Sequence, residues 1–242
     1  MTSPSSSRRP TSTRFRAVVF DLYDTLYPEA SYVLSGFKAV AAHAARHMGW
    51  PAEQALRELT RLYQEGVRGD TFNRWLRSRA RESAELVAEL VAVYRAHRPC
   101  LEPFPGTLGL LESLRRSYRL GLVSDGYLEV QKAKLEALGL EPYLDAVVFS
   151  DRFGRAGWKP SPRAFEAALA ELGVAPPDAV YVADNPAKDF LAGKRLGMYG
   201  LRLRTPGCEH ALREPPTPEH APDGEIASLR ELESYLGALA VR

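Results

Sequence analysis

The sequence predicts an α/β protein: a doubly wound parallel sheet of the Rossmann-like kind, with a bundle of helices inserted after the first strand. Two observations predict the sheet. Short apolar runs lack the polar alternation of a half-exposed strand, and in the second half of the chain they alternate with segments of helical periodicity. A third observation predicts the insert, because between residues 30 and 99 apolar side chains recur at intervals of three and four without any strand-like run.

The first strand is expected at Arg16–Phe20, where RAVVF is mostly apolar and ends at Asp21. A four-helix insert is expected over residues 30–99, so that the core comprises residues 14–29 and 100–242. Glycine and proline separate the helices of the insert, which we expect at Ala30–Met48, Ala52–Gln64, Thr71–Arg79 and Glu82–His97. Because the insert leaves the carboxyl end of a parallel strand, where such sheets bind ligands, we expect it to act as a lid.

Helices and strands are expected to alternate from residue 107 onward. The strands are expected at Arg119–Val123, Ala146–Phe149, Val180–Ala183 and Gly200–Leu203. The helices are expected at Thr107–Arg116, Leu128–Leu138, Pro162–Leu172 and Ala187–Leu196, each about as long as a crossover between parallel strands requires. The segment Pro206–Asp223, rich in Pro, Glu and His, predicts an irregular excursion before a last helix at Ile226–Leu236.

The composition is that of an ordinary globular protein. Hydrophobic residues make up 45% of the 242 residues, and 32 basic residues nearly balance 30 acidic ones. No basic stripe is present, so we expect no nucleic-acid binding, and no apolar run reaches the roughly 18 residues of a membrane span. We expect a cytoplasmic protein, monomeric or homodimeric, in which the Ser-, Arg- and Pro-rich residues 1–13 form a disordered tail.

Chemically reactive side chains are expected where the predicted strands end and in the loops that follow them. The set comprises Asp21, Ser124, Asp125, Lys159, Asp184 and Asp189. Because the carboxyl ends of parallel strands share one edge of a sheet, these groups should meet in one crevice. A carboxylate nucleophile, a hydroxyl, a lysine and an acidic pair are together what attack on a phosphorus centre requires. The sequence therefore points to phosphoryl transfer.

Four motifs occur in the order FDLYDTL, LVSDG, WKP and VADNPAKD. In order, spacing and strand context they resemble the motifs of the haloacid dehalogenase (HAD) superfamily of hydrolases, over a stretch from about Phe15 to Leu203. The helical insert after the first motif looks like the C1-type cap of that family. The resemblance implies a phosphatase that uses Mg²⁺ and acts on a small phosphorylated metabolite.

The resemblance also implies a role for each motif residue. Asp21 would be the nucleophile that becomes an aspartyl-phosphate, and Lys159 would tie this nucleophile to the phosphate. Ser124 and the backbone N–H of Asp125 would hold the phosphoryl oxygens. The ligands of Mg²⁺ would be Asp21, Asp184, Asp189 and the carbonyl oxygen of Tyr23.

The first motif departs from the pattern of the family's phosphatases at Tyr23, where those enzymes carry a general-acid Asp. A phenol, whose reference pKa is about 10, exchanges protons poorly near neutral pH, and general acid–base catalysis typically contributes about 10² to 10⁴ in rate. The neighbouring Asp24 lies one residue further along a tight turn, so we expect its carboxylate to point elsewhere.

The motifs leave three functions open. Tyrosine at position 23 resembles the family's 2-haloacid dehalogenases, which expel a halide that needs no proton, whereas two carboxylates in the fourth motif suit a hard cation and favour a Mg²⁺-dependent phosphatase. A catalytically weak or non-enzymatic phosphate-binding relative is the third. The bland interpretation of Tyr23 itself is an inert aromatic side chain packed under the cap. We favour the phosphatase, with Tyr23 in the general-acid position.

Substrate contacts are expected from the insert. Its central loop, Glu65–Asp70, contains two glycines and could dip toward the site. Arg68 in this loop is the candidate ligand for a second anionic group of the substrate.

Overall fold

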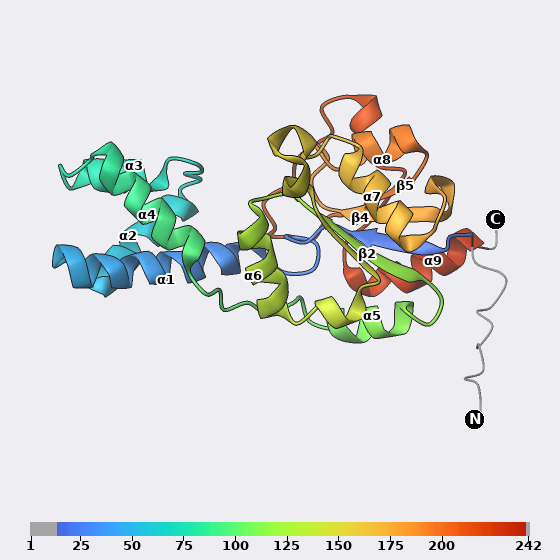
Figure 1. Ribbon diagram of the computed structural model, residues 1–242, viewed down its shortest axis with the longest axis horizontal. Helices are drawn as coiled ribbons and strands as arrows, with labels where there is room; N and C mark the ends of the chain where they lie inside the picture. The colour runs from blue at the N-terminus through green and yellow to red at the C-terminus, as the bar shows by residue number, and fades with distance from the viewer. Residues whose placement is uncertain (1–13, 241–242) are drawn as a thin grey trace. The chain divides into compact units, whose positions relative to one another are not determined.

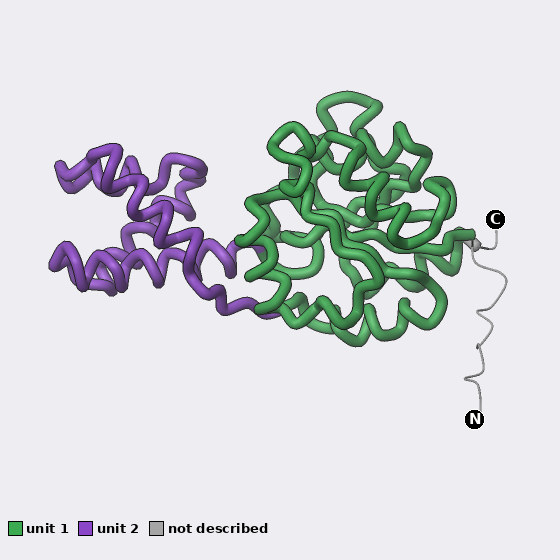
Figure 2. Tube along the Cα trace, in the orientation of Figure 1, with its two compact units in different colours: residues 1–28, 103–242 green, residues 29–102 purple. Residues whose placement is uncertain are grey.

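The computed structural model describes residues 14–240, so the tail predicted at residues 1–13 lies outside the described residues. The chain divides into two compact units (Figure 2). One unit is Glu29–Glu102, and the other combines the chain before and after it, within residues 1–28 and 103–242. The insert thus starts at Glu29 rather than at residue 30, and it ends at Glu102 rather than at residue 99.

Within residues 14–240, six parallel strands form one sheet in the order β3-β2-β1-β4-β5-β6 (Figure 1). The strands are β1 (Ala17–Phe20), β2 (Arg119–Ser124), β3 (Ala146–Phe149), β4 (Ala179–Ala183), β5 (Tyr199–Leu203) and β6 (Gly224–Ile226). Every residue of β1 and β4 is buried, which is why AVVF and AVYVA show no polar alternation. The predicted doubly wound parallel sheet is confirmed.

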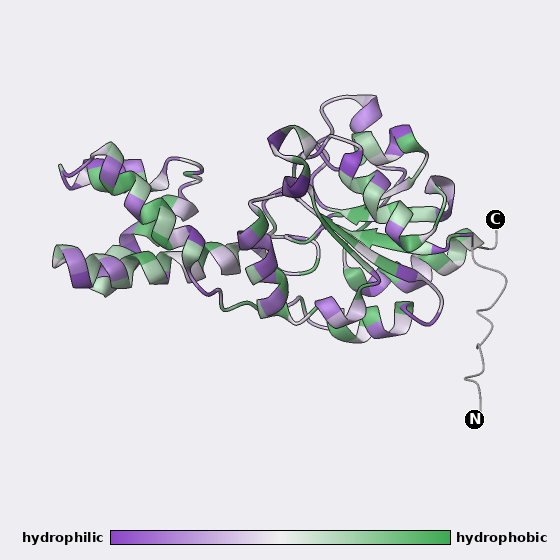
Figure 3. Cartoon of the chain, in the orientation of Figure 1, coloured by the Kyte–Doolittle hydropathy of each residue, from purple (hydrophilic) through white to green (hydrophobic). Residues whose placement is uncertain are grey.

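Helices cover both faces of this sheet. On one face, α7 (Arg163–Leu172) and α8 (Phe190–Leu196) share an apolar cluster with the strands. Figure 1 shows α5 (Thr107–Leu114) and α9 (Leu232–Ala240) on the other face, while α6 (Leu128–Leu138) follows β2. In Figure 3 the strands are the most apolar part of this unit. No helix within residues 14–240 is long and apolar enough to cross a membrane.

Short 3₁₀ turns complete the connections, at Glu141–Tyr143, Ser150–Phe153, Arg155–Gly157, Pro176–Asp178, Pro218–His220 and Leu229–Glu231. The helix predicted from Ile226 is wrong at its start, because residues Gly224–Ile226 form an edge strand and α9 begins only at Leu232. Three residues that include a glycine and a glutamate are too few to show strand periodicity. The excursion after β5 therefore ends in a sixth strand.

The inserted unit is a four-helix bundle made of α1 (Glu29–Met48), α2 (Ala52–Gln64), α3 (Thr71–Ser78) and α4 (Ala84–Ala96). Its core is rich in aromatic side chains, including Phe37 and Trp75. The indole N–H of Trp75 donates to Glu58 at 2.7 Å, and Arg79 lies 2.6 Å from the same carboxylate. The polar atom of this buried indole is therefore satisfied, as buried tryptophan requires.

Candidate active site

The sheet brings Asp21 and Asp184 together at its topological switch point. β2 lies on one side of β1 and β4 on the other, so the crossovers diverge and leave a crevice at the carboxyl ends of the strands. Asp21 follows β1, and its N–H donates to the carbonyl oxygen of Val182 in β4 at 2.9 Å. Asp184 follows β4, and both aspartates are buried. This meeting of two strand ends is the one that the sequence predicts.

Lys159 connects the buried carboxylates. Its Nζ lies 2.5 Å from Asp21 Oδ1 and 2.6 Å from Asp189 Oδ1, and it donates to the hydroxyl of Tyr181 at 2.9 Å. The side chains of the lysine and of both aspartates are 0% exposed. Burial by itself would lower the pKa of the ammonium, but the carboxylates of Asp189 and Asp21 raise it above its ordinary value. Lys159 is therefore a buried cation held between two carboxylates.

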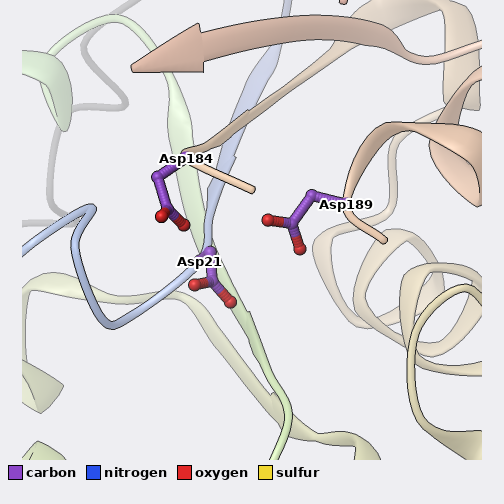
Figure 4. A group of neighbouring side chains, drawn as sticks. All are labelled: Asp21, Asp184 and Asp189. Carbon is purple, nitrogen blue, oxygen red and sulfur yellow. The ribbon is translucent and has the colours of Figure 1, made fainter. Parts of the chain in front are cut away.

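Asp21, Asp184 and Asp189 form a compact acidic cluster (Figure 4), in which one oxygen of each lies within 4.8 Å of the others. Burial raises the pKa of Asp21 to about 6 even though Lys159 lowers it. Burial, together with the charges of Asp189 and Asp21, raises the pKa of Asp184 to about 9. Among the described residues, Asp21 Oδ2 and both carboxylate oxygens of Asp184 have no hydrogen-bond partner. Such buried oxygens are costly unless satisfied, and they are the ligands that a hard divalent cation takes.

Ser124 and Asp125 follow one another at the end of β2 but face different partners. The buried Oγ of Ser124 has no hydrogen-bond partner in the part of the chain that the structure describes. The carboxylate of Asp125 instead accepts from Ser150 Oγ at 2.6 Å and from the backbone N–H of Lys159 at 3.1 Å. This carboxylate therefore positions the Lys159 loop, and the predicted phosphate contact of the Asp125 backbone N–H stays a prediction.

Tyr23 is half-buried and has two ammonium groups beside it. Lys188 Nζ donates to the Tyr23 hydroxyl at 2.5 Å, and it lies 4.7 Å from the centroid of the ring. Lys134 Nζ lies 5.4 Å from the same centroid. Asp24 adopts a left-handed backbone conformation with φ 51°, and its Oδ2 accepts from the N–H of Glu209 at 3.2 Å. The carboxylate of Asp24 thus faces a distant loop, whereas Tyr23 is bound to a lysine of the fourth motif.

Sequence reasoning missed Lys188, Tyr181 and Ser150. A signal for Lys188 was available, because this lysine stands beside Asp189 in the fourth motif. Tyr181 and Ser150 carried no signal, since a tyrosine within an apolar strand is typical of core packing and a serine after a strand is typical of a turn.

Arg68 belongs to the inserted unit, in the loop between α2 and α3. Its Nη1 donates to the carbonyl oxygens of Tyr63 at 2.7 Å and Val67 at 3.0 Å, and its guanidinium lies 3.8 Å from the centroid of the Tyr63 ring. These three residues line a cavity of about 240 Å³ within the insert. The predicted contact of Arg68 with a second anionic group of a substrate stays a prediction.

Comparisons with known proteins agree with the motifs and the topology. The sequence model of the haloacid dehalogenase-like hydrolases matches residues 15–197. Glyceraldehyde 3-phosphate phosphatase of Methanopyrus kandleri is 34% identical over 234 residues, which are 93% of this chain and 98% of that protein. (S)-2-haloacid dehalogenase 4A of Burkholderia cepacia is 30% identical over 227 residues, which are 90% of this chain and 93% of that protein. The crystal structure of a HAD phosphatase from Thermococcus onnurineus superposes with a TM-score of 0.60 at 28% identity, covering 92% of this chain and 98% of that one. The chain belongs to the haloacid dehalogenase-like hydrolases.

Proposed function

We propose that this chain is a Mg²⁺-dependent phosphatase that hydrolyses small phosphorylated metabolites through an aspartyl-phosphate at Asp21. The observation that carries the proposal is the carboxylate cluster around Lys159. Asp21 Oδ1 lies 2.5 Å from the Lys159 ammonium, while Asp21 Oδ2 has no hydrogen-bond partner among residues 14–240. One carboxylate oxygen is thus held in place, and no protein donor competes with substrate or metal for the other.

The reaction proceeds in two steps. Asp21 attacks the phosphorus, the bond to the leaving oxygen breaks, and the phosphoryl group is transferred to the carboxylate. Water then cleaves the aspartyl-phosphate, which releases inorganic phosphate and restores Asp21. Lys159 balances charge on the phosphoryl oxygens, and Ser124 Oγ with the N–H of Asp125 hold those oxygens.

The residues that would hold the Mg²⁺ are Asp21, Asp184, Asp189 and, through its carbonyl oxygen, Tyr23. The fit is supported by the unpartnered oxygens of Asp21 and Asp184 and by the raised pKa of each of these two carboxyls, which indicates a cluster short of positive charge. When bound, the cation would offset the negative charge of the carboxylates and of the phosphoryl group.

Tyr23 is proposed to protonate the leaving oxygen. Its own oxygen accepts from Lys188, and this orients the hydroxyl hydrogen away from the ammonium. A tyrosine gives up a proton less readily than a carboxylic acid near neutral pH, so esters with acidic leaving groups should react fastest. The M. kandleri relative is named for glyceraldehyde 3-phosphate, which makes this triose phosphate the first metabolite to test.

Dehalogenation of 2-haloacids is the second candidate, favoured by Tyr23 and by the B. cepacia relative. In that reaction Asp21 would displace a halide from carbon, and water would then cleave the resulting ester. The leaving halide needs neither a proton nor a metal. The acidic cluster supports the phosphatase instead, because a metal-free reaction gives Asp184 no partner for its two buried oxygens.

One screen tests both functions. The protein and its Asp21→Asn variant are assayed for phosphate release from p-nitrophenyl phosphate, glyceraldehyde 3-phosphate and other sugar phosphates, in Mg²⁺ and in EDTA. Chloride release from 2-chloropropionate is measured in the same two buffers. Phosphate release that needs both Mg²⁺ and Asp21 supports the proposal. Chloride release that persists in EDTA would support the dehalogenase, and release of neither product would support the non-enzymatic relative.

A further inference from the structure

Arg202 is a fully buried arginine on β5, the strand between β4 and the edge strand β6. It lies on β5 opposite Ala183 of β4, the residue before Asp184, and its side chain is 0% exposed. Removing a guanidinium from water is costly unless its donors are satisfied. An arginine in a buried strand position therefore calls for a reason beyond packing, because an apolar side chain of similar volume would avoid that cost.

The guanidinium donates most of its hydrogen bonds to backbone carbonyl oxygens and only one to a carboxylate. Nε donates to the carbonyl oxygen of Asp184 at 3.2 Å. Nη2 donates to the carbonyl oxygens of His210 at 2.8 Å and Arg213 at 2.6 Å, and Nη1 reaches Glu225 at 3.3 Å. One side chain thus joins the end of β4 to the excursion after β5 and to β6.

The contact with the main chain of Asp184 matters because, among the described residues, no hydrogen bond holds the side chain of this aspartate. Asp21 and Asp189 are both held by Lys159, at 2.5 and 2.6 Å. Neither carboxylate oxygen of Asp184 has a hydrogen-bond partner among the described residues. The position of its carboxylate therefore depends on its main chain, and Arg202 is bound to that main chain.

The excursion that Arg202 holds is itself linked to the first motif. The N–H of Glu209 donates to Asp24 Oδ2 at 3.2 Å, next to the His210 carbonyl that accepts from Arg202. The same guanidinium therefore supports both sides of the acidic cluster: it holds Asp184 directly and the turn after Asp21 through the excursion.

We propose that Arg202 is a positioning residue for the metal site, which fixes the main chain of Asp184 and so sets the affinity of the acidic cluster for a divalent cation. The proposal rests on the metal site of the proposed function, but it requires no particular substrate. Groups that orient metal ligands typically change metal affinity by about 10- to 100-fold when they are removed.

Direct binding of Mn²⁺, followed by its electron paramagnetic resonance signal and by competition with Mg²⁺, tests this role without any turnover. Arg202→Ala should raise the Kd for Mn²⁺ by about 10- to 100-fold. Added guanidinium ion, kept well below denaturing concentrations, should fill the vacated space and recover part of the affinity. Arg204→Ala is the matched control. Arg204 directly follows β5 and pairs with Glu214 at 3.1 Å and Glu225 at 3.5 Å, and neither contact involves Asp184. The Kd of this variant for Mn²⁺ should therefore stay within about twofold of the wild-type value.

Arg202→Lys decides the case if the alanine variant does not fold, as judged by circular dichroism. A lysine keeps the positive charge but cannot span the carbonyls that the planar guanidinium joins, so the weakened Mn²⁺ affinity should persist. An unchanged Kd in the folded Arg202 variant would overturn the proposal. A wild-type protein that binds no Mn²⁺ would overturn the metal dependence of the proposed function as well, so the two failures are distinguishable.

Discussion

The strand-end site and the inserted bundle bury polar groups in opposite ways. In the bundle, the one polar atom of the buried Trp75 is paired with Glu58, and ion pairs such as that between Arg57 and Glu53 are exposed. At the strand ends, Lys159 and the carboxylates of the acidic cluster are buried, and oxygens of Asp21 and Asp184 have no hydrogen-bond partner within the described residues. Unsatisfied buried groups destabilise a fold, so the site keeps them at the expense of stability.

The contrast separates stability from chemistry. Substitutions of the cluster carboxylates Asp21 and Asp184 should abolish or impair activity and leave the fold as stable as before, or more stable. Substitutions in the core of the bundle should lower stability and leave the metal site unchanged. Each of the following predictions tests one side of this difference.

Asp21→Asn carries the largest expected effect. The amide is nearly isosteric but cannot form the phosphoryl intermediate, so phosphate release should fall by about 10⁴-fold or more. Because burial raises the pKa of Asp21 to about 6, the charged form is disfavoured in the fold, and removing the charge should leave the thermal midpoint equal or higher. Steady-state assays measure the phosphate release, and calorimetry measures the thermal midpoint. A variant that loses activity by unfolding would contradict the contrast.

Tyr23→Asp should raise the hydrolysis of alkyl and sugar phosphates by up to about 10² to 10⁴, because a carboxyl can protonate alkoxide leaving groups. Hydrolysis of p-nitrophenyl phosphate should scarcely change, since that leaving group needs little protonation. A series of esters measured in wild type and variant gives the dependence of kcat/KM on leaving-group pKa, which should be steep in wild type and flatter in the variant. Loss of activity on every ester in a folded variant would mean that the phenol, bound to Lys188, has a role that an acid cannot fill.

Trp75→Ala addresses the bundle. Trp75 is 1% exposed and packs edge-to-face on Trp50 at 5.2 Å, so its removal leaves a cavity and should cost about 3–5 kcal/mol of unfolding free energy. Urea unfolding measures the loss. Glu53→Gln, at an exposed ion pair of α2, is the control and should change little. The Kd for Mn²⁺ should stay that of wild type, and a tenfold rise would show that the two units are energetically coupled.

The last prediction concerns the pH dependence of stability in the absence of metal. The pKa of Asp184 is raised to about 9, so between about pH 4 and pH 9 the folded state binds a proton that the unfolded state has lost. In EDTA this carboxyl therefore makes stability fall as pH rises through that window, and Asp184→Asn should flatten the dependence. At saturating Mg²⁺ wild type should gain about 2.7 kcal/mol at 100 times the Kd, and the variant should gain less. Thermal scans of wild type and Asp184→Asn in EDTA measure this difference. The same pH dependence in both proteins would contradict a raised pKa of Asp184.

Much of the fold could be predicted because the strands and helices carry their own local signals. The range Ala146–Phe149 for β3 and the ranges Ala52–Gln64 for α2 and Leu128–Leu138 for α6 match the prediction residue for residue. β6 could not be predicted, since GEI becomes a strand only through its pairing with β5. A three-residue edge strand is a product of the sheet and leaves no local pattern.

The strand-end rule could likewise predict that Asp21 meets Asp184, because it depends on topology alone. It could not predict which partner each side chain chooses. Tyr181 lies 22 positions from Lys159 and Lys188 lies 165 positions from Tyr23, and both contacts depend on side-chain conformations that no spacing encodes. The burial of Arg202 could not be predicted either. An alternating Leu-Arg-Leu-Arg run indicates a half-exposed strand and not a buried guanidinium.

Trapping the covalent intermediate tests the central claim most directly. Wild-type protein is mixed with p-nitrophenyl phosphate and Mg²⁺, quenched in acid within a single turnover, digested and examined by mass spectrometry. A phosphoryl group on Asp21, absent from samples in EDTA and from Asp21→Asn, is the predicted result. Phosphate release with no phosphoryl group on Asp21, or with the group on another residue, would contradict the account.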